Sequence, residues 1–150
     1  MKKILLALCL TGFVAVAQAQ LNPISWTFTA KKTGDKTYEL QMKATIQAKW
    51  HLYSQTQPED AVAMPTTFVL NPNPLFTLEG KIKESGKMEK FTDKTLGVSA
   101  NQYSNTVTFT QVVKLKSKVK TSITGTVEYQ TCDDQKCLPP KKLNFKVALD

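Results

Sequence analysis

The chain has 150 residues, 41% hydrophobic and 21% charged, which is the composition of a single globular domain and excludes a disordered chain. Its formal net charge is +8, and all 20 basic residues are lysines. Arginine provides the planar fork that reads phosphate and guanine, so a chain without arginine is poorly suited to nucleic acid. We interpret the lysines as a solvated surface.

The first nineteen residues have the pattern of a secretory signal peptide. Lys2 and Lys3 precede an apolar stretch over residues 4–17, and Ala17-Gln18-Ala19 forms a small-x-small cleavage site. This stretch of about 14 residues is shorter than the roughly 20 that an uncleaved membrane-spanning helix needs. We therefore expect cleavage near Ala19, a single domain over residues 20–150 without a transmembrane span, and a periplasmic or secreted location.

Alternating apolar and polar residues predict a chain built of β-strands. The clearest alternation covers residues 38–47, where every second side chain is apolar. The other candidate strands cover residues 26–30, 50–55, 66–70, 76–83, 107–115, 123–129 and 143–149. Turns are expected at residues 33–36, 71–74 and 85–87. About eight strands with short turns predict an all-β fold, an immunoglobulin-like antiparallel β-sandwich, with a closed barrel as the alternative.

Residues 85–105 are poorly patterned for a strand and long for a connection. Loops longer than about 12–15 residues in compact domains are usually functional or disordered. We interpret this segment as a loop that is either mobile or built to cover a site.

Two cysteines remain after removal of the signal peptide, Cys132 and Cys137. They are too close in sequence to join two sheets, so they can pair only across a hairpin or tight loop. If Val127 and Tyr129 face the core, strand alternation predicts that Cys132 faces outward and is accessible. A bridge closing about six residues stabilises the fold by only ~2 kcal/mol. The pair is therefore either a labile, exchanging disulfide or a structural clip, and chemistry alone leaves both open.

The charges beside the two cysteines differ. Asp133 and Asp134 follow Cys132 and disfavour its thiolate, whereas Lys136 precedes Cys137 and favours its thiolate. If exchange occurs, we expect Cys137 to be the sulfur that meets a partner.

A metal centre is not expected. The two cysteines and the single histidine, His51, offer three soft ligands, and a tetrahedral structural zinc site needs four. Gly-rich phosphate loops and Ser-His-Asp patterns are also absent from the sequence. We therefore expect no metal and no cofactor.

Residues 127–140, with the sequence VEYQTCDDQKCLPP, resemble the N-terminal periplasmic domain of the thiol:disulfide interchange protein DsbD. Residues 50–55 and 78–81 also match that family. The resemblance implies an immunoglobulin-like fold with a redox-active pair, Cys132 and Cys137, in which Cys137 pairs with partners. It implies electron transfer from a thioredoxin-like domain, itself reduced through a membrane-embedded domain, to periplasmic client proteins that carry disulfides. Those clients include disulfide isomerases and cytochrome c maturation thioredoxins.

The resemblance also implies a cap loop that shields the cysteines. In the family this loop has an aspartate and an aromatic residue shortly before a glycine. Asp93 and Gly97 match that pattern, whereas Leu96 or Thr95 stands near the place of the missing aromatic. Shielding is then either looser in this chain or provided by Phe91.

Three further residues are expected to line the site by the same resemblance. Tyr53 matches a family tyrosine, His51 replaces another, and Tyr129 lies within the cysteine motif. Because the sequence ends at Asp150 without a membrane domain or a thioredoxin-like domain, we expect the reductant to be a separate protein.

The competing hypothesis is an exported immunoglobulin-like binding module. In that case Cys132–Cys137 is only a structural hairpin disulfide. The lysine-rich face or the long loop would then contact another envelope protein.

Overall fold

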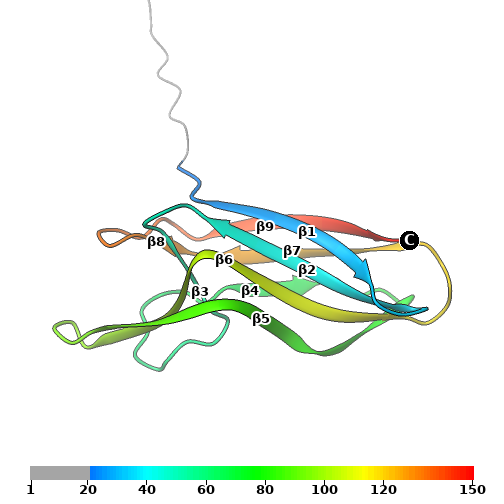
Figure 1. Ribbon diagram of the computed structural model, residues 1–150, viewed down its shortest axis with the longest axis horizontal. Helices are drawn as coiled ribbons and strands as arrows, with labels where there is room; N and C mark the ends of the chain where they lie inside the picture. Colours follow the sequence, from blue (N-terminus) through cyan, green and yellow to red (C-terminus); the bar gives the residue numbers. More distant parts are fainter. Residues whose placement is uncertain (1–20) are drawn as a thin grey trace, which may run out of the picture.

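The computed structural model describes residues 21–150, so the expected signal peptide lies outside the described residues. Two β-sheets pack face to face within this range, and the strands run along the long axis of the molecule (Figure 1). The strands are β1 (Ile24–Lys32), β2 (Thr37–Ile46), β3 (His51–Tyr53), β4 (Thr67–Leu70), β5 (Phe76–Asp93), β6 (Val98–Leu115), β7 (Thr121–Tyr129), β8 (Thr131–Cys132) and β9 (Lys141–Leu149). Residues 21–150 contain no helix and therefore no helical segment able to cross a membrane.

The sheets confirm the expected antiparallel sandwich rather than a closed barrel. The larger sheet has the order β1-β2-β6-β3-β8, and its sixth strand, β5, also pairs with β6. The smaller sheet has the order β4-β7-β9. Every strand pair is antiparallel, so neighbouring strands can be joined by short turns such as the predicted one between β1 and β2.

The main core lies between the two sheets and follows the alternation seen in the sequence. Leu40, Met42 and Ala44 of β2 point inward and are fully buried, while the residues between them are more exposed. Trp26 extends this core with aromatic contacts to both sheets. Its neighbours are Phe28, Phe68, Phe109 and Tyr129, with ring centroids 5.5–5.9 Å away.

The loop expected over residues 85–105 and the turn expected at residues 85–87 are both wrong. β5 and β6 form one long hairpin, whose outer end projects beyond the sandwich (Figure 1). The register shifts between Gly86 and Met88, where β5 bulges. A Cβ on Gly86 would lie 3.0 Å from the Thr106 carbonyl oxygen, so this close approach favours glycine. Most residues of the outer part of β5 are exposed. Apolar and polar residues alternate along a strand when one of its faces is buried, so a largely exposed strand shows no clear alternation.

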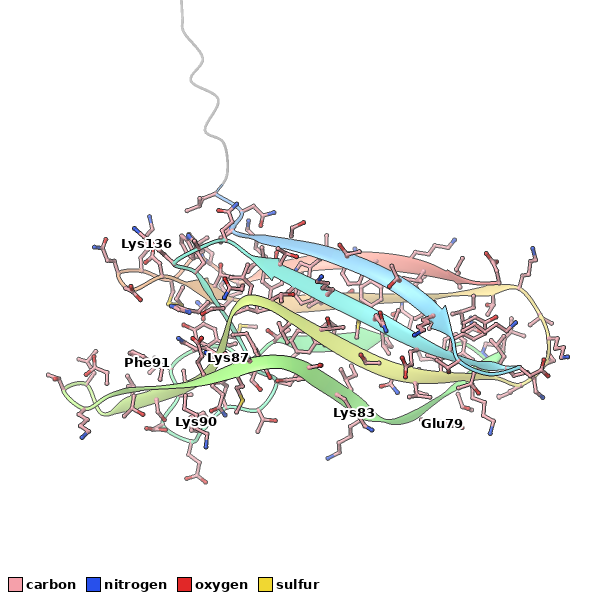
Figure 2. The ribbon with its side chains drawn as sticks, in the orientation of Figure 1. Glu79, Lys83, Lys87, Lys90, Phe91 and Lys136 are labelled. Atoms are coloured by element: carbon pink, nitrogen blue, oxygen red, sulfur yellow. A yellow bond between two sulfur atoms is a disulfide. The ribbon has the colours of Figure 1, made fainter. Side chains whose placement is uncertain are left out.

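β5 is an edge strand and carries a row of exposed lysines. Lys83 and Lys90 extend from it on the lower side of the molecule in Figure 2, and Lys87 is exposed as well. Lysines on an exposed edge prevent two sheets from pairing edge to edge, because the charges would be buried together. The lysines of β5 thus form a solvated edge.

Candidate functional site

A disulfide joins Cys132, at the end of β8, to Cys137, with an S–S distance of 2.01 Å and a Cα–Cα distance of 4.0 Å. The two cysteines face each other as an isolated antiparallel pair. The Asp133 N–H donates to the Lys136 carbonyl at 2.9 Å, and the Leu138 N–H donates to the Thr131 carbonyl at 2.8 Å. The cysteine loop, residues 132–137, is therefore a tight hairpin closed by both a covalent bond and backbone hydrogen bonds.

Asp133 shapes the turn of the cysteine loop. Its Oδ1 accepts hydrogen bonds from the N–H groups of Gln135, at 2.9 Å, and Lys136, at 2.7 Å. These two bonds lower the pKa of the Asp133 carboxyl, because they stabilise its ionised form. A negative charge is thereby fixed directly beside Cys132.

The expectation that Cys132 faces outward is wrong, because the residue is only 3% exposed. That expectation extended the alternation of β7 through residue 132. The chain instead leaves the smaller sheet after Tyr129 and enters β8 in the larger sheet at Thr131. Gln130 spans the crossing; its side chain accepts from the Met64 N–H and donates to the Leu138 carbonyl. The crossing resets which side chains point inward.

Cys137, in contrast, is an exposed residue. The disulfide thus has one cysteine inside the protein and one at the surface. Cys132 packs with Tyr53 and Ala100 in a small second cluster, and Ala63 packs against it. Leu52 and Tyr103 pair with each other and belong to the main core. Tyr53 and Ala100 stand an odd number of residues from them along β3 and β6, so the second cluster lies on the opposite face of the larger sheet.

A groove of about 410 Å³ opens beside the cysteine loop. It is lined by His51, Tyr53, Phe91, Asp93, Gln102, Asp133 and Asp134. Phe91 and the cysteine-loop residue Lys136 lie at the same end of the molecule (Figure 2). The groove therefore brings His51, Tyr53 and Asp93, all expected at the site, next to the cysteine loop, and its carboxylates give it an acidic wall.

His51 is the central polar residue of this groove. Its Nδ1 lies 3.1 Å from Ser104 Oγ, and Ser104 donates to Glu89 Oε2 at 3.0 Å. Its Nε2 lies 3.6 Å from Asp134 Oδ1. A continuous polar chain thus links the β5–β6 hairpin to the cysteine loop through His51.

The expected cap residues lie at the tip of the β5–β6 hairpin. Asp93 Oδ1 accepts hydrogen bonds from the N–H groups of Thr95, at 2.8 Å, and Leu96, at 3.1 Å. Gly97 has a φ of 65°, the left-handed backbone region that favours glycine. The Leu96 side chain is 73% exposed and does not line the groove, whereas Phe91 does.

The two expected tyrosines lie in different places. Tyr53 lines the groove and belongs to the second cluster, where burial raises the pKa of its hydroxyl. Tyr129 lies in the main core against Trp26, and burial raises its pKa as well. The structure therefore brings Tyr53, but not Tyr129, to the groove.

Glu84 of β5 joins the segment after β3 to β6 and was not identified from the sequence. Its carboxylate accepts hydrogen bonds from Ser54 Oγ at 2.8 Å, the Gln55 N–H at 2.7 Å and the Tyr103 hydroxyl at 2.5 Å. Burial and this bond to Glu84 raise the pKa of Tyr103. No local sequence pattern distinguishes Glu84, because its partners come from a distant loop and from β6.

The roles of Gln102 and Ser104 also escaped the sequence analysis. Both lie in the segment that was interpreted as a loop, so their strand positions could not be assigned. Within residues 21–150, no three His, Cys, Asp or Glu side chains are grouped so that they could hold a metal ion.

Comparisons with known proteins extend over nearly the whole described chain. The family described as "Thiol:disulfide interchange protein DsbD, N-terminal" matches residues 18–149. A search of curated proteins found no match.

Three solved structures share the fold. The reduced N-terminal domain of Neisseria meningitidis DsbD is 15% identical, with a TM-score of 0.53, over 83% of this chain and 86% of that one. The N-terminal periplasmic domain of ScsB from Proteus mirabilis is 16% identical, with a TM-score of 0.52, over 85% of this chain and 45% of that one. The complex of the DsbD and PilB N-terminal domains from Neisseria meningitidis contains a chain 17% identical, with a TM-score of 0.52, over 87% of this chain and 88% of that one. The family match over residues 18–149 shows that this chain belongs to the family of N-terminal domains of the thiol:disulfide interchange protein DsbD.

Proposed function

We propose that this chain relays electrons by thiol–disulfide interchange through Cys132 and Cys137. The observation that carries the proposal is the unequal exposure of the bonded pair: Cys132 is 3% exposed, whereas Cys137 is exposed beside an open groove. Exchange requires an accessible sulfur for the incoming thiolate and a second sulfur that leaves and later returns. A purely structural clip has no need of this asymmetry.

The relay accepts electrons in two steps. A thiolate of the reductant attacks Cys137 Sγ and forms a mixed disulfide, while the bond to Cys132 breaks and its electron pair goes to Cys132 Sγ. A second thiol of the reductant, as thiolate, then attacks its own sulfur in the mixed disulfide and releases Cys137. The reductant ends as a disulfide, and this chain ends with two thiols.

Electrons leave by the same chemistry in reverse. The Cys137 thiolate attacks a client disulfide and forms a mixed disulfide with one client sulfur. Cys132 then attacks Cys137 Sγ, which restores the Cys132–Cys137 bond and releases the reduced client. The relay needs no cofactor, because both electrons stay on sulfur throughout.

The partners follow from this chemistry and from the family. We assign the donor to a thioredoxin-like or membrane-embedded disulfide reductase, and the acceptors to periplasmic proteins with disulfides. The solved complex between a DsbD N-terminal domain and the PilB N-terminal domain supports a protein domain as partner.

The same assignment puts the protein in the periplasm after cleavage near Ala19. One structural relative is itself described as a periplasmic domain, which supports this location. Sequencing of the mature N-terminus from an envelope fraction should begin at Gln20.

The hairpin tip carrying Asp93, Leu96 and Gly97 is the element that we assign to shielding the disulfide. Phe91, which lines the groove and lies 46% exposed, takes the part of the aromatic side chain in this shield. The shield would limit reduction by small thiols while leaving room for a partner that displaces the tip.

The reduction potential separates the relay from a structural clip. The oxidised protein is equilibrated in buffers of defined dithiol ratio, and its free thiols are counted by alkylation. We expect a value within roughly −180 to −270 mV, the span of known exchange proteins. A value below about −300 mV would mark a structural bridge and contradict the relay.

A matched pair of variants identifies the attacking sulfur. Cys132→Ser leaves exposed Cys137 without its resolving partner, so mixed disulfides with donor or client should accumulate. Cys137→Ser leaves only buried Cys132, and no mixed disulfide should form. Equal trapping by both variants, or trapping by Cys137→Ser alone, would contradict the assignment of Cys137.

A further inference from the structure

His51 stands opposite Cys132, the residue whose sulfur the proposed function releases as a thiolate, and the inference below rests on that function. β3 and β8 pair so that His51 is directly opposite Cys132. Opposite residues on neighbouring strands project to the same face, with Cβ atoms about 5 Å apart. Cys132 is 3% exposed, so water is poorly placed to solvate its thiolate, and a buried charge without a partner is costly. A proton donor at the position of His51 would remove that charge as it forms.

The hydrogen-bond chain around His51 fixes which nitrogen carries the exchangeable proton. Ser104 donates its only hydroxyl hydrogen to Glu89 Oε2, so Ser104 Oγ must accept from His51. This network assigns a hydrogen to Nδ1. Nε2 faces Asp134 Oδ1, 3.6 Å away, on a side chain that is 86% exposed. The neutral ring therefore carries its hydrogen on Nδ1, and a protonated ring carries its second hydrogen on Nε2, the nitrogen that faces the cysteine loop.

No other cation is available in the described groove. The titratable groups that face His51 are Asp133 and Asp134 from the cysteine loop, Glu89 and Asp93 from β5, and Tyr53 from β3. All of these are acidic or neutral. His51 alone among the described residues lining the groove can be positively charged, and histidine is the side chain that changes charge between about pH 5 and 8.

We propose that His51 is the proton donor for Cys132 during disulfide exchange. As a partner thiolate bonds to Cys137 Sγ, the Cys132–Cys137 bond breaks and its electron pair moves to Cys132 Sγ. The Nε2 proton then passes to that sulfur, leaving a neutral imidazole and a Cys132 thiol. The His51 side chain is 19% exposed, so the imidazole regains a proton from solvent across the groove. In the reverse direction the imidazole removes the Cys132 proton and activates the sulfur for attack on the mixed disulfide.

The test is the pH profile of disulfide reduction in wild type and in His51→Gln. Oxidised protein is reduced with dithiothreitol between pH 5.5 and 9, and the rate is divided by the concentration of dithiothreitol thiolate. Glutamine keeps an N–H donor for Ser104 but cannot deliver a proton. We expect the wild-type rate constant to fall across the histidine range, and the variant to be about 10-fold slower at pH 6 and equal at pH 9. Lys118→Gln, which removes a cation that pairs with Asp35 away from the groove, should keep the wild-type profile.

Two outcomes of this comparison overturn the proposal. Superimposable profiles for wild type and His51→Gln would exclude proton donation, and an equal loss of rate at every pH would indicate a structural role only. A disulfide that reacts with dithiothreitol but with no protein partner would refute the relay and leave the proton donor standing. If His51→Gln fails to fold, NMR titration of this single histidine in wild type replaces it. The ring midpoint must then coincide with the step in the rate profile, and a mismatch would refute the role of His51.

Discussion

The larger sheet of this protein carries two different regions on its two faces. Toward the smaller sheet lies the main core, a continuous set of buried side chains from both sheets. On the other face, at the cysteine end, lies the second cluster of Tyr53, Ala100 and Cys132, beside an acidic groove. Adjacent residues divide between them, since Leu52 belongs to the main core and Tyr53 to the second cluster. Strand alternation thus lets the same strands build the main core on one face and carry the second cluster beside the groove on the other.

The largest difference between the two regions is expected from Phe109→Ala, which should lower stability without changing the disulfide reaction. Phe109 is fully buried in the main core, with ring centroids 4.9 Å from Phe68 and 5.9 Å from Trp26. We expect a loss of about 3–5 kcal/mol in the free energy of unfolding, because the deletion leaves a cavity. Urea unfolding followed by tryptophan fluorescence measures this loss. The rate of disulfide reduction without urea should not change, and a comparable change in that rate would show that the two regions are coupled.

Reduction of the disulfide is the corresponding change in the second region. A closed loop of about six residues stabilises the fold by only ~2 kcal/mol, so the reduced protein should keep its sandwich. Urea unfolding of oxidised and reduced protein, with the reduced thiols left unblocked, gives the difference directly. Loss of the near-ultraviolet circular dichroism of the main core on reduction would contradict the separation of the two regions.

Tyr103→Phe probes the point where the regions meet, because the Tyr103 ring lies in the main core and its hydroxyl bonds to Glu84. Loss of that hydrogen bond should cost about 1 kcal/mol at neutral pH. Burial and Glu84 raise the pKa of Tyr103 above its ordinary value of 10.0. The stabilisation by the neutral hydroxyl is therefore complete below pH 10 and is lost as pH rises through the higher value of the folded state. Unfolding measured at several pH values should show the variant and wild type converging above pH 10, and a constant gap would contradict this linkage.

The sequence predicts a region well when the pattern that forms it lies within single strands, and poorly when its contacts join strands far apart in the chain. The main core was predictable, because its strands alternate along their own length, as in Leu40, Met42 and Ala44. The burial of Cys132 was not, because the crossing at Gln130 moves the chain to another sheet, and no local pattern marks that change. The pairing of His51 with Cys132 depends on the register between strands far apart in the chain. The cysteine spacing nevertheless predicted a pairing across a tight loop, and the structure joins Cys132 to Cys137 in such a loop.

The smallest effect on stability, under about 1 kcal/mol, is expected from Phe91→Ala, because the side chain is 46% exposed and little of its area is lost from a packed environment. Its effect on the rate of disulfide reduction should be large. Phe91 lines the groove beside the cysteine loop, so its removal should speed reduction of the disulfide by glutathione several-fold, at every pH and without changing the shape of the pH profile.

Lys90→Ala is the matched control, since Lys90 is the preceding residue on β5 and projects from the other face of the hairpin (Figure 2). Equal rates in wild type and Phe91→Ala would mean that the disulfide is shielded by its own loop and not by the hairpin. A rate increase confined to Phe91→Ala would show that a side chain with almost no part in stability controls access to the sulfur. Stability and access to the disulfide would then depend on different faces of the larger sheet.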